Sequence, residues 1–344
     1  MIEAVPLAVH TIYQDLLDAW LMQPEAPVEG APFVREVDGK RYWYANMRIN
    51  GHVRTRYIGP DTDDVRRRIE ALQSSREDRA AFEARCGTMI AQLRAAGLPT
   101  LDMQSGKVLS ALARAGVFRL GGTLIGTHAF ALYAAELGMW VSGRAVPMTE
   151  DIDIAAFERL AMVIEDKPDP DLAEALKPLG LKPVPGLEPG QDGARWAARG
   201  GGTPIDFLTP SFDDEEGVRA LPSLGVRAQS LHFLNFLIAD PIPAVGLYRA
   251  GVLVRIPRPE RFAVHKLIVA SRRPAHQRAK ARKDLAQARA LMEALEETRP
   301  QELAAALDTA WRTGPKWRAA IRDSLARSPD LQVMAARHID MDDA

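Results

Sequence analysis

The chain has a single cysteine, Cys86, among its 344 residues. One cysteine can form no intramolecular disulfide and no cysteine cluster for zinc, which suits a reducing cytoplasm. The chain also lacks any stretch of about 18 uncharged apolar residues, and its N-terminus lacks the basic start and long apolar core of a signal peptide. We therefore expect a cytoplasmic protein that does not span a membrane and has no membrane partner.

Neither sign of charge dominates the composition. The 44 Lys and Arg residues nearly balance the 45 Asp and Glu residues, so the formal net charge is −1. The whole chain thus gives no sign of a polyanionic partner, and charge has to be read locally. The apolar share of 47% predicts a soluble globular protein with material for two or three domains.

The first third of the chain changes from helical to strand periodicity and back. Residues 1–22 carry apolar residues at helical spacing and predict an amphipathic helix. Three strand-like runs follow, separated by dipeptides that favour tight turns: Phe33–Val37, Tyr42–Met47 and Val53–Ile58, with Asp38-Gly39 and Asn50-Gly51 between them. They predict a small antiparallel meander that interleaves Arg and Lys with aromatic residues. A charged helix from Thr62 to Ala96 ends at Gly97-Leu98-Pro99.

The middle of the chain alternates between strand-like and helix-like segments, which predicts a mixed sheet with helices, an α+β fold. The apolar run Val117–Leu120 predicts a strand, followed by Gly121-Gly122-Thr123 and a helix from Leu124 to about Gly138. Later strand candidates lie near Leu181–Val184, Ala194–Ala198 and Pro204–Leu208, and at Val245–Tyr248 and Val252–Ile256. Helical patterns dominate from Glu260 to Arg337. We expect three domains: 1–98 with the meander, 99–215 with the sheet, and a mainly helical 216–344.

The most informative stretch is Glu150-Asp151-Ile152-Asp153-Ile154. Residues two apart on a strand face the same way, so Asp151 and Asp153 would share one face while the isoleucines face the core. Two carboxylates about 7 Å apart repel by roughly 2 kcal/mol at an effective dielectric constant near 20. Such a strand needs water or a cation beside it, and Mg²⁺ is a hard ion that prefers carboxylate oxygens. An isolated Asp-x-Asp is nevertheless common, and on its own it is more often solvated than metal-bound.

Two further features support a metal and phosphate site. Asp206 is a single carboxylate in the otherwise apolar strand candidate Ile205–Leu208, where an unpaired buried charge is costly. Gly121-Gly122-Thr123 lies between a predicted strand and a predicted helix, where glycines let phosphate approach the backbone and the helix N-terminus offers free N–H groups. By itself a Gly-Gly pair is equally typical of a simple tight turn.

The order of these parts resembles the nucleotidyltransferase superfamily. That resemblance implies that Asp151, Asp153 and Asp206 hold two Mg²⁺ ions, with Mn²⁺ as a substitute, and that Asp206 helps to deprotonate the acceptor. The ions would align a nucleophile with the α-phosphate of an NTP and neutralise the pyrophosphate leaving group. Gly121, Gly122 and Thr123 would contact the triphosphate.

Most of the chain also resembles a bacterial family of stand-alone nucleotidyltransferase-fold proteins in which a basic hairpin region precedes the catalytic domain. The likeness includes Tyr57–Pro60, Ile205–Pro210 and Pro259–Lys266. More distantly, the chain is similar to nucleotidyltransferase toxins of abortive-infection systems, which share a Lys-bearing helix and a later Lys-Asp pair, here Lys266 and Lys283-Asp284. Many superfamily members have Gly-Ser in place of the Gly-Gly-Thr, and the long spacer to Asp151 predicts an insertion near Val141–Met148.

A basic segment follows in the last third. From Arg255 to Arg289 there are eleven Lys or Arg residues and two acidic residues, a net charge of +9 in a chain of net −1. Such asymmetry favours a polyanion, either a triphosphate or nucleic acid. We expect Lys266, with Arg273 on the same helical face, and Lys283 to bind the nucleotide. Asp284 is expected to hold the helix by accepting from a nearby Lys or Arg.

Three functions remain open at this point. The first is an enzyme that transfers NMP from an NTP to RNA, protein or a small molecule. The second is a non-catalytic module that binds nucleotide or nucleic acid on the same fold, with the meander as the contact surface. The third is an interaction protein whose carboxylates are merely solvated. For the meander we expect acceptor recognition, with a plain packing role as the alternative. The sequence does not indicate the oligomeric state.

Overall fold

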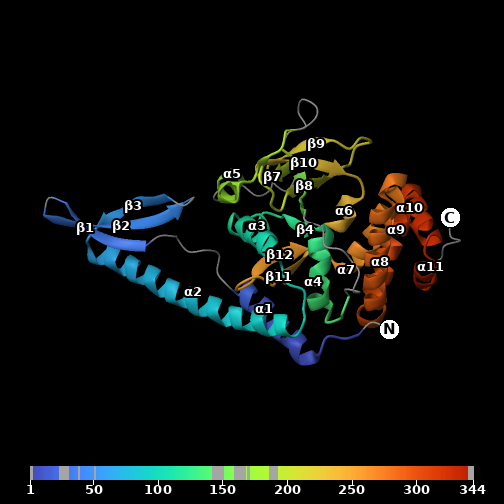
Figure 1. The fold of residues 1–344 in the computed structure, drawn as a ribbon, viewed down its shortest axis with the longest axis horizontal. Coiled ribbons are helices and arrows are strands. Elements are labelled where there is room, and N and C mark those ends of the chain that lie inside the picture. Colours follow the sequence, from blue (N-terminus) through green and yellow to red (C-terminus); the bar gives the residue numbers. More distant parts are fainter. Residues whose placement is uncertain are drawn as a thin grey trace.

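The computed structural model describes residues 3–22, 31–37, 39–49, 52–141, 151–158, 168, 171–185 and 193–339. The residues Asp38, Asn50 and Gly51 of the predicted turns, the predicted insertion after Val141, and Glu150 lie outside these ranges. The described elements form a body with an elongated arm at one end (Figure 1).

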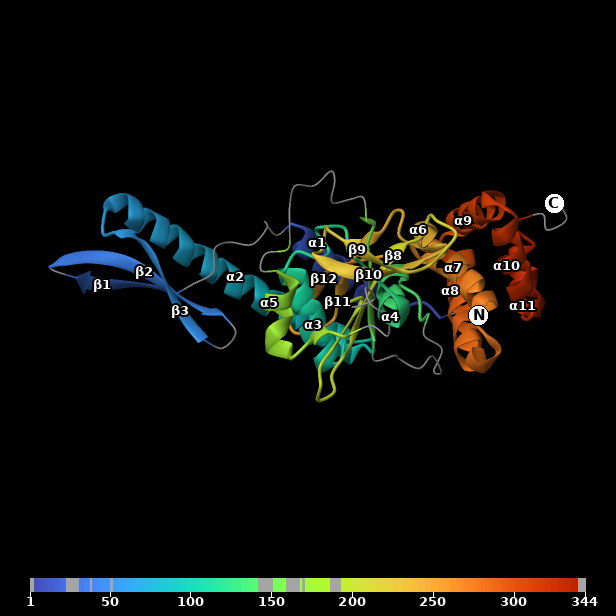
Figure 2. The ribbon, with the colours of Figure 1, turned by 90° about the horizontal axis from the view of Figure 1, so that it is seen from above.

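The arm consists of the predicted meander and the long helix that follows it. Strands β1 (Ala31–Val37), β2 (Lys40–Ile49) and β3 (His52–Pro60) form an antiparallel sheet in the order β1-β2-β3, as the sequence predicts. Helix α2 (Asp63–Ala95) is capped by the Thr62 side chain and ends before Gly97, whose positive φ of 93° suits glycine. The meander lies at the far end of α2 (Figures 1 and 2).

Helix α1 (Leu7–Leu21) confirms the first predicted helix, but it belongs to the body rather than to the arm. Tyr13 and Leu16 are completely buried, and the Tyr13 hydroxyl accepts a hydrogen bond of 3.2 Å from the backbone N–H of Val245. They share a core cluster with Ile90 and Leu93 near the C-terminal end of α2. The C-terminal end of α2 is thus anchored in the body, next to α1.

The central sheet has the strand order β4-β5-β8-β10-β9. Its strands are β4 (Thr123–Ile125), β5 (Ile152–Ala155), β8 (Ile205–Pro210), β9 (Val218–Leu221) and β10 (Val226–Leu231), with the hairpin β6 (Lys182–Pro183) and β7 (Arg195–Ala197) beside the start of β8. Strand β5 is parallel to β8 and antiparallel to β4, so the sheet is mixed, as predicted. Strands β9 and β10 complete this sheet although they follow the predicted boundary at 215/216.

One prediction in the sheet is wrong. Residues 117–121 form turns rather than a strand, and the strand is β4, which begins at Thr123 itself. The helix α4 (Gly126–Leu137) therefore starts at Gly126, and it ends as predicted at Gly138, which has a left-handed conformation. Helix α3 (Met103–Arg114), capped by Asp102, precedes the turns, and α5 (Leu172–Leu176) follows β5 in the chain.

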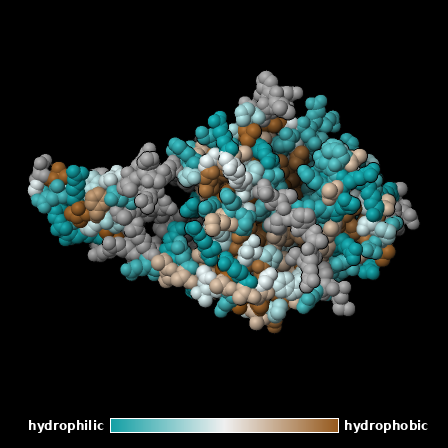
Figure 3. Space-filling model, in the orientation of Figure 1, coloured by the Kyte–Doolittle hydropathy of each residue, from teal (hydrophilic) through white to brown (hydrophobic). Residues whose placement is uncertain are grey.

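The last part of the chain is mainly helical, as predicted. A short helix α6 (Leu234–Leu237) and the hairpin β11 (Ile242–Gly246) and β12 (Val252–Ile256) lead into the helices α7 (Pro259–Arg272), α8 (Arg278–Thr298), α9 (Pro300–Thr313), α10 (Pro315–Ala326) and α11 (Pro329–Ala335). Hydrophilic side chains cover most of the visible face of these helices (Figure 3). No helix within the described ranges is long and apolar enough to cross a membrane.

Candidate active site

Two of the predicted carboxylates lie side by side on neighbouring strands. The parallel register of β5 and β8 pairs Asp153 with Asp206. Lateral neighbours on a sheet face the same way, whereas Ile152, Ile154 and Phe207 point to the other side and are completely buried. The alternation that the sequence predicted thus orients both strands, and the pairing of β5 with β8 brings the two carboxylates together.

A cation that the sequence analysis missed lies between two of the carboxylates. Arg195 on β7 is in register with Asp206. Its guanidinium donates to Asp206 Oδ2 at 2.7 Å and to Asp151 Oδ1 at 3.0 Å. Asp151, immediately before β5, therefore reaches the same cluster as the other two carboxylates. Only the strand candidate at 194–198 pointed to this arginine, because nothing local in the sequence pairs β7 with β8.

Asp153 is the carboxylate whose ionised form is least stabilised. Burial, followed by the charge of Asp206, raises its pKa to about 7, and the charge of Lys266 opposes this shift only in part. Burial also raises the pKa of Asp206, against the effect of Arg195. Within the described ranges no hydrogen bond reaches the Asp153 side chain. A cation beside Asp153 and Asp206 would relieve this electrostatic cost.

The glycines of the expected phosphate loop are not at the carboxylates. Gly121 and Gly122 precede β4, and Thr123 pairs with Ala155, at the opposite end of β4 from Asp153. Thr123 is buried, and a Cβ on Gly122 would meet the backbone of Val117. The physical reason is that the loop joins a turn to a strand, so no helix N-terminus follows it directly.

Gly126 and Thr127 occupy the position that the sequence analysis gave to those glycines. They begin α4, directly after Ile125, which is in register with Asp153. Gly126 has a φ of +68°, and a Cβ there would clash with Oδ2 of Asp153. The glycine thus permits a close approach between a helix N-terminus and a carboxylate. The Leu124–Thr127 sequence held this signal, but β4 is too short to be recognised by its periodicity.

The two predicted lysines both lie near these groups. The Nζ atom of Lys283 on α8 donates to Thr127 Oγ1 at 2.9 Å. Burial, and then the charge of Lys266, lowers the pKa of Lys283. Lys266 on α7 donates to Asp284 at 2.7 Å, and its side chain is 12% exposed. Lys283 therefore links the C-terminal helices to the start of α4.

Asp284 plays the structural role that the sequence predicts. It is 4% exposed and accepts from Lys266 through Oδ1 and from Arg273 through Oδ2, the latter at 3.0 Å. Lys266 and Arg273 are the two residues expected to share a helical face, and both are tied to this one carboxylate. The carboxylate holds α7 to α8.

A cleft of about 620 Å³ is lined both by carboxylates of the sheet and by cations of α7. The sheet contributes Asp153 and Asp206 to its lining, and α7 contributes Lys266, Arg272 and Arg273. Gly126 lines it as well. Apolar side chains complete the lining, so the cleft combines anionic, cationic and apolar surface in one space large enough for a small ligand.

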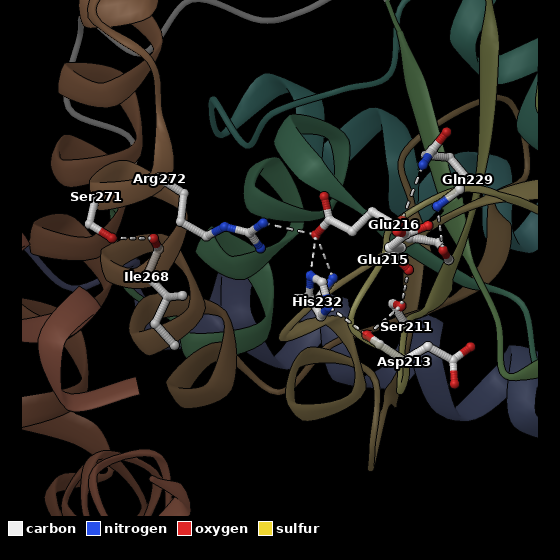
Figure 4. A network of polar contacts seen from close by, with 11 residues as sticks. Ser211, Asp213, Glu215, Glu216, Gln229, His232, Ile268, Ser271 and Arg272 are labelled. Carbon is white, nitrogen blue, oxygen red and sulfur yellow. Dashed lines mark hydrogen bonds and ion pairs between the residues drawn. The ribbon is translucent and has the colours of Figure 1, made fainter. Parts of the chain in front are cut away.

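A second polar cluster that the sequence analysis missed also lines the cleft. Glu216 Oε1 accepts from Arg272 Nη2 and faces Nδ1 of His232, each at 2.9 Å. Figure 4 shows Arg272 reaching from α7 to this carboxylate, with His232 beside it. Burial acts to raise the pKa of Glu216, but the bonds from the His232 backbone and Arg272 hold it below the ordinary value. Glu216 thereby orients Arg272 at the edge of the cleft.

Three other chemically notable residues are buried. His128 on α4 is buried, with Nε2 3.0 Å from Ser105 Oγ. Cys86 is completely buried, and burial raises the pKa of its thiol. His265 on α7 is buried, and its pKa is lowered to about 3, mainly by burial. His265 nevertheless lines the cleft, and the backbone and charge of Asp151 act on the pKa of His128.

The residues present fit a divalent cation, although Arg195 currently neutralises two of the carboxylates. Among the described residues, no group of three or more His, Cys, Asp or Glu side chains stands ready to hold a metal ion. Asp153 and Asp206, however, provide adjacent hard oxygen donors, and the raised pKa values of both show that their negative charge is undercompensated.

The pKa of Asp153 predicts a pH-dependent stability. Its pKa is 3.8 in the unfolded chain and about 7 in the fold, so the folded state binds more protons between these values and the free energy of unfolding falls as the pH rises through them. We expect Asp153→Asn to stabilise the metal-free protein more at pH 8 than at pH 5, by about 1.5 kcal/mol after allowance for solvent screening. Thermal unfolding at both pH values measures this.

Mg²⁺ provides the second half of that test. It should raise the unfolding temperature of the wild type at pH 8, and do so much less in Asp153→Asn. Asp308→Asn, an exposed carboxylate on α9 paired with Arg312, is the matched control and should respond like the wild type. An equal response of all three proteins to pH and to Mg²⁺ would show that the pKa of Asp153 is not raised in the fold and that Asp153 does not bind the ion.

The comparisons with known proteins identify the family of the chain. Residues 103–312 match the model of a protein family described as Nucleotidyltransferase, and residues 8–67 match a domain of unknown function, DUF6788. No curated protein matches the chain. The crystal structure of an antigenic nucleotidyltransferase-like protein from Paracoccidioides brasiliensis is similar over 70% of this chain and 97% of that chain, with 13% sequence identity and a TM-score of 0.36, too low to support an argument. The family match spans more than half of the chain and includes all three carboxylates, so the chain belongs to the nucleotidyltransferase family.

Proposed function

We propose that the protein transfers the nucleoside monophosphate of an NTP to a hydroxyl group of an acceptor. The observation that carries this proposal is the in-register pair Asp153 and Asp206, which faces a cleft shared with the cations of α7. Carboxylates alone would repel a triphosphate, and cations alone would bind it without activating an acceptor. Their combination in one cleft suits phosphoryl-group chemistry.

Asp153 and Asp206, with Asp151 beside them, would hold Mg²⁺. When bound, the metal supplies Lewis acidity at the α-phosphate and offsets the charge of the pyrophosphate leaving group. In the transfer, the acceptor oxygen forms a bond to the α-phosphorus while the bond from that phosphorus to the bridging oxygen of the β-phosphate breaks. Asp206, a carboxylate in the lining of the cleft, would take the proton of the acceptor hydroxyl.

The phosphates are expected to bind at the start of α4 rather than at Gly121-Gly122-Thr123. A helix N-terminus offers free N–H groups and a positive dipole end to an anion. Gly126 lines the cleft, and Lys283 donates to the adjacent Thr127. Lys283 can move its ammonium group from the Thr127 hydroxyl to a phosphate oxygen with little rearrangement. Lys266 and Arg273 supply positive charge while they remain bound to Asp284.

A second function is favoured by one observation. Arg195 is paired with both Asp151 and Asp206. A chain that keeps this arginine between its carboxylates would bind nucleotide through its cations without turnover. Arg195 is 45% exposed, so it is free to leave when a stronger cation arrives, and for this reason we place the enzyme first.

Labelled nucleotide distinguishes the two functions. The protein is incubated with Mg²⁺, total RNA or protein extract, and NTPs that carry ³²P at either the α or the γ position. We expect label from the α position, and not from the γ position, in an acceptor, and a chelator should abolish it. Retained NTP binding without incorporation, with either Mg²⁺ or Mn²⁺, would favour the binding module.

A further inference from the structure

The arm holds its sheet far from the cleft. Helix α2 has 33 residues, so it is about 50 Å long at 1.5 Å per residue. Both ribbon views show the three-stranded sheet at the end of α2 that points away from the body (Figures 1 and 2). A sheet in this position contributes nothing to the core of the body, and the matched domain that includes it has no assigned function.

One face of the arm sheet is directed at α2. Trp43 on β2 donates through Nε1 to Asp61 Oδ1 at 2.7 Å, just before α2 begins. Val65 and Ile69 are buried in the part of α2 that follows. Because side chains alternate along a strand, Tyr42 and Tyr44 lie on the opposite face from Trp43. That opposite face is directed away from α2.

The face away from α2 combines aromatic rings with positive charge. Phe33 pairs with Tyr44 in the register of β1 and β2, and their rings stack with centroids 5.8 Å apart. Arg35 pairs with Tyr42. The three rings are only half-buried, while Arg35 and Lys40 are exposed. We call Phe33, Arg35, Lys40, Tyr42 and Tyr44 the aromatic face. Apolar residues stand out among hydrophilic ones at this end of the molecule (Figure 3).

The charge of the arm sheet is opposite to that of the rest of the chain. Residues 31–60 contain six Lys or Arg residues and two acidic residues, a net charge of +4. The whole chain has a net charge of −1, so the other residues together carry −5. The net positive charge of the arm sheet would therefore attract a polyanion, in addition to the basic segment of the body.

We propose that the aromatic face binds single-stranded nucleic acid. Unpaired bases stack on half-exposed aromatic rings of a sheet, and arginine and lysine beside the rings neutralise the backbone phosphates. Aromatic residues and arginine also occur in protein interfaces, but the net charge of +4 on the arm sheet favours a polyanion. A duplex would hide its bases from the rings. RNA and DNA share this chemistry, so both are included in the test.

The position of the arm indicates which acceptor the protein would select, an inference that rests on the proposed function. A small acceptor could not touch the aromatic face and the cleft at once. A polymer at least as long as α2, on the order of 15 nucleotides or more at 3.4 Å each, could do so. The arm would thus select a nucleic-acid acceptor whose reacting end lies well away from the segment that is recognised.

The test measures binding without catalysis. Fluorescence anisotropy of the full-length protein is recorded with labelled 20-nucleotide RNA, DNA of the same sequence, and the corresponding duplexes, without NTP or metal. We expect both single strands to bind more tightly than the duplexes. The double variant Phe33→Ala/Tyr44→Ala should weaken single-strand binding at least ten-fold. Arg35→Glu, a change at an exposed strand position, should also weaken it and reduce its salt dependence.

The control is Phe212→Ala, which removes a 71% exposed phenylalanine from the body and should leave binding unchanged. Unchanged binding in Arg35→Glu and in the double variant, or tighter binding of duplexes, would overturn the proposal, as would the absence of any oligonucleotide binding.

A circular-dichroism spectrum identifies a variant that fails to fold. If the double variant does not fold, the result for Arg35→Glu decides. Normal binding of single-stranded nucleic acid without NMP transfer would contradict the proposed function but would support the proposal for the aromatic face.

Discussion

Asp206→Asn is expected to lower the rate of nucleotidyl transfer by about 10³-fold, equivalent to about 4 kcal/mol of activation free energy. The substitution keeps the shape of the side chain and removes its charge. Asp206 lies in register with Asp153 and lines the cleft, so the substitution would remove both a proposed donor to the metal and the proposed base. The rate of incorporation of α-labelled NMP at saturating NTP measures the effect.

Arg195 provides the control for this experiment. Asp206→Asn also removes the partner of Arg195 Nη1, and a loss of that ion pair alone would have a different meaning. Arg195→Gln breaks the same pair and keeps both carboxylates, so it should retain far more activity than Asp206→Asn. Equal losses in the two variants would assign the effect to the ion pair. Full activity of Asp206→Asn would remove Asp206 from the site.

The face of the strand on which each carboxylate lies could be predicted, because it depends on local alternation. Because side chains alternate along a strand, Asp153 lies on the face opposite to Ile152 and Ile154. In the same way, Asp206 lies on the face opposite to Phe207. The register that joins the two strands could not be predicted, because β5 and β8 are separated by about 50 residues in the sequence and no short-range feature fixes their pairing. The sequence therefore indicated the two charged faces but not their contact.

The error at Gly121-Gly122-Thr123 has a physical cause. Val117 and Leu120 are almost completely buried, which gives their segment the apolar pattern of a strand although it consists of turns. Periodicity cannot separate such short runs, and β4 is only three residues long. A Gly-Thr pair between the apolar Leu124-Ile125 and an apolar helix was the better signal. It became visible only once the contact between Gly126 and Asp153 was known.

Arg195 and the Glu216–His232 pair escaped prediction for a further reason. Each depends on tertiary contacts between elements that the sequence places apart: β7 with β8, and α7 with the region around β9 and β10. Nothing in the composition of these segments marks them as functional. By contrast, the abundance of Lys and Arg after Arg255 was visible in the sequence, and two of these residues contact Asp284.

Asp284→Ala is expected to lower the free energy of unfolding by about 3 kcal/mol, the largest stability effect among the polar residues considered. The carboxylate is 4% exposed and accepts from Lys266 and Arg273. Its removal leaves two cations without their partner in a largely water-excluded position, next to a third cation at Lys283. Urea unfolding measures the loss. Asp308→Ala, which breaks an exposed pair with Arg312, should cost less than about 1 kcal/mol.

A double variant separates repulsion among the cations from a loss of packing. If the destabilisation arises because Lys266 keeps an uncompensated charge, then Asp284→Ala/Lys266→Met should be more stable than Asp284→Ala alone, since methionine fills similar space without charge. Equal or lower stability of the double variant would instead assign the loss to packing between α7 and α8. The same variant also tests the cleft: without Lys266, NTP affinity should stay low even where stability is recovered, because the charge beside Asp153 is gone.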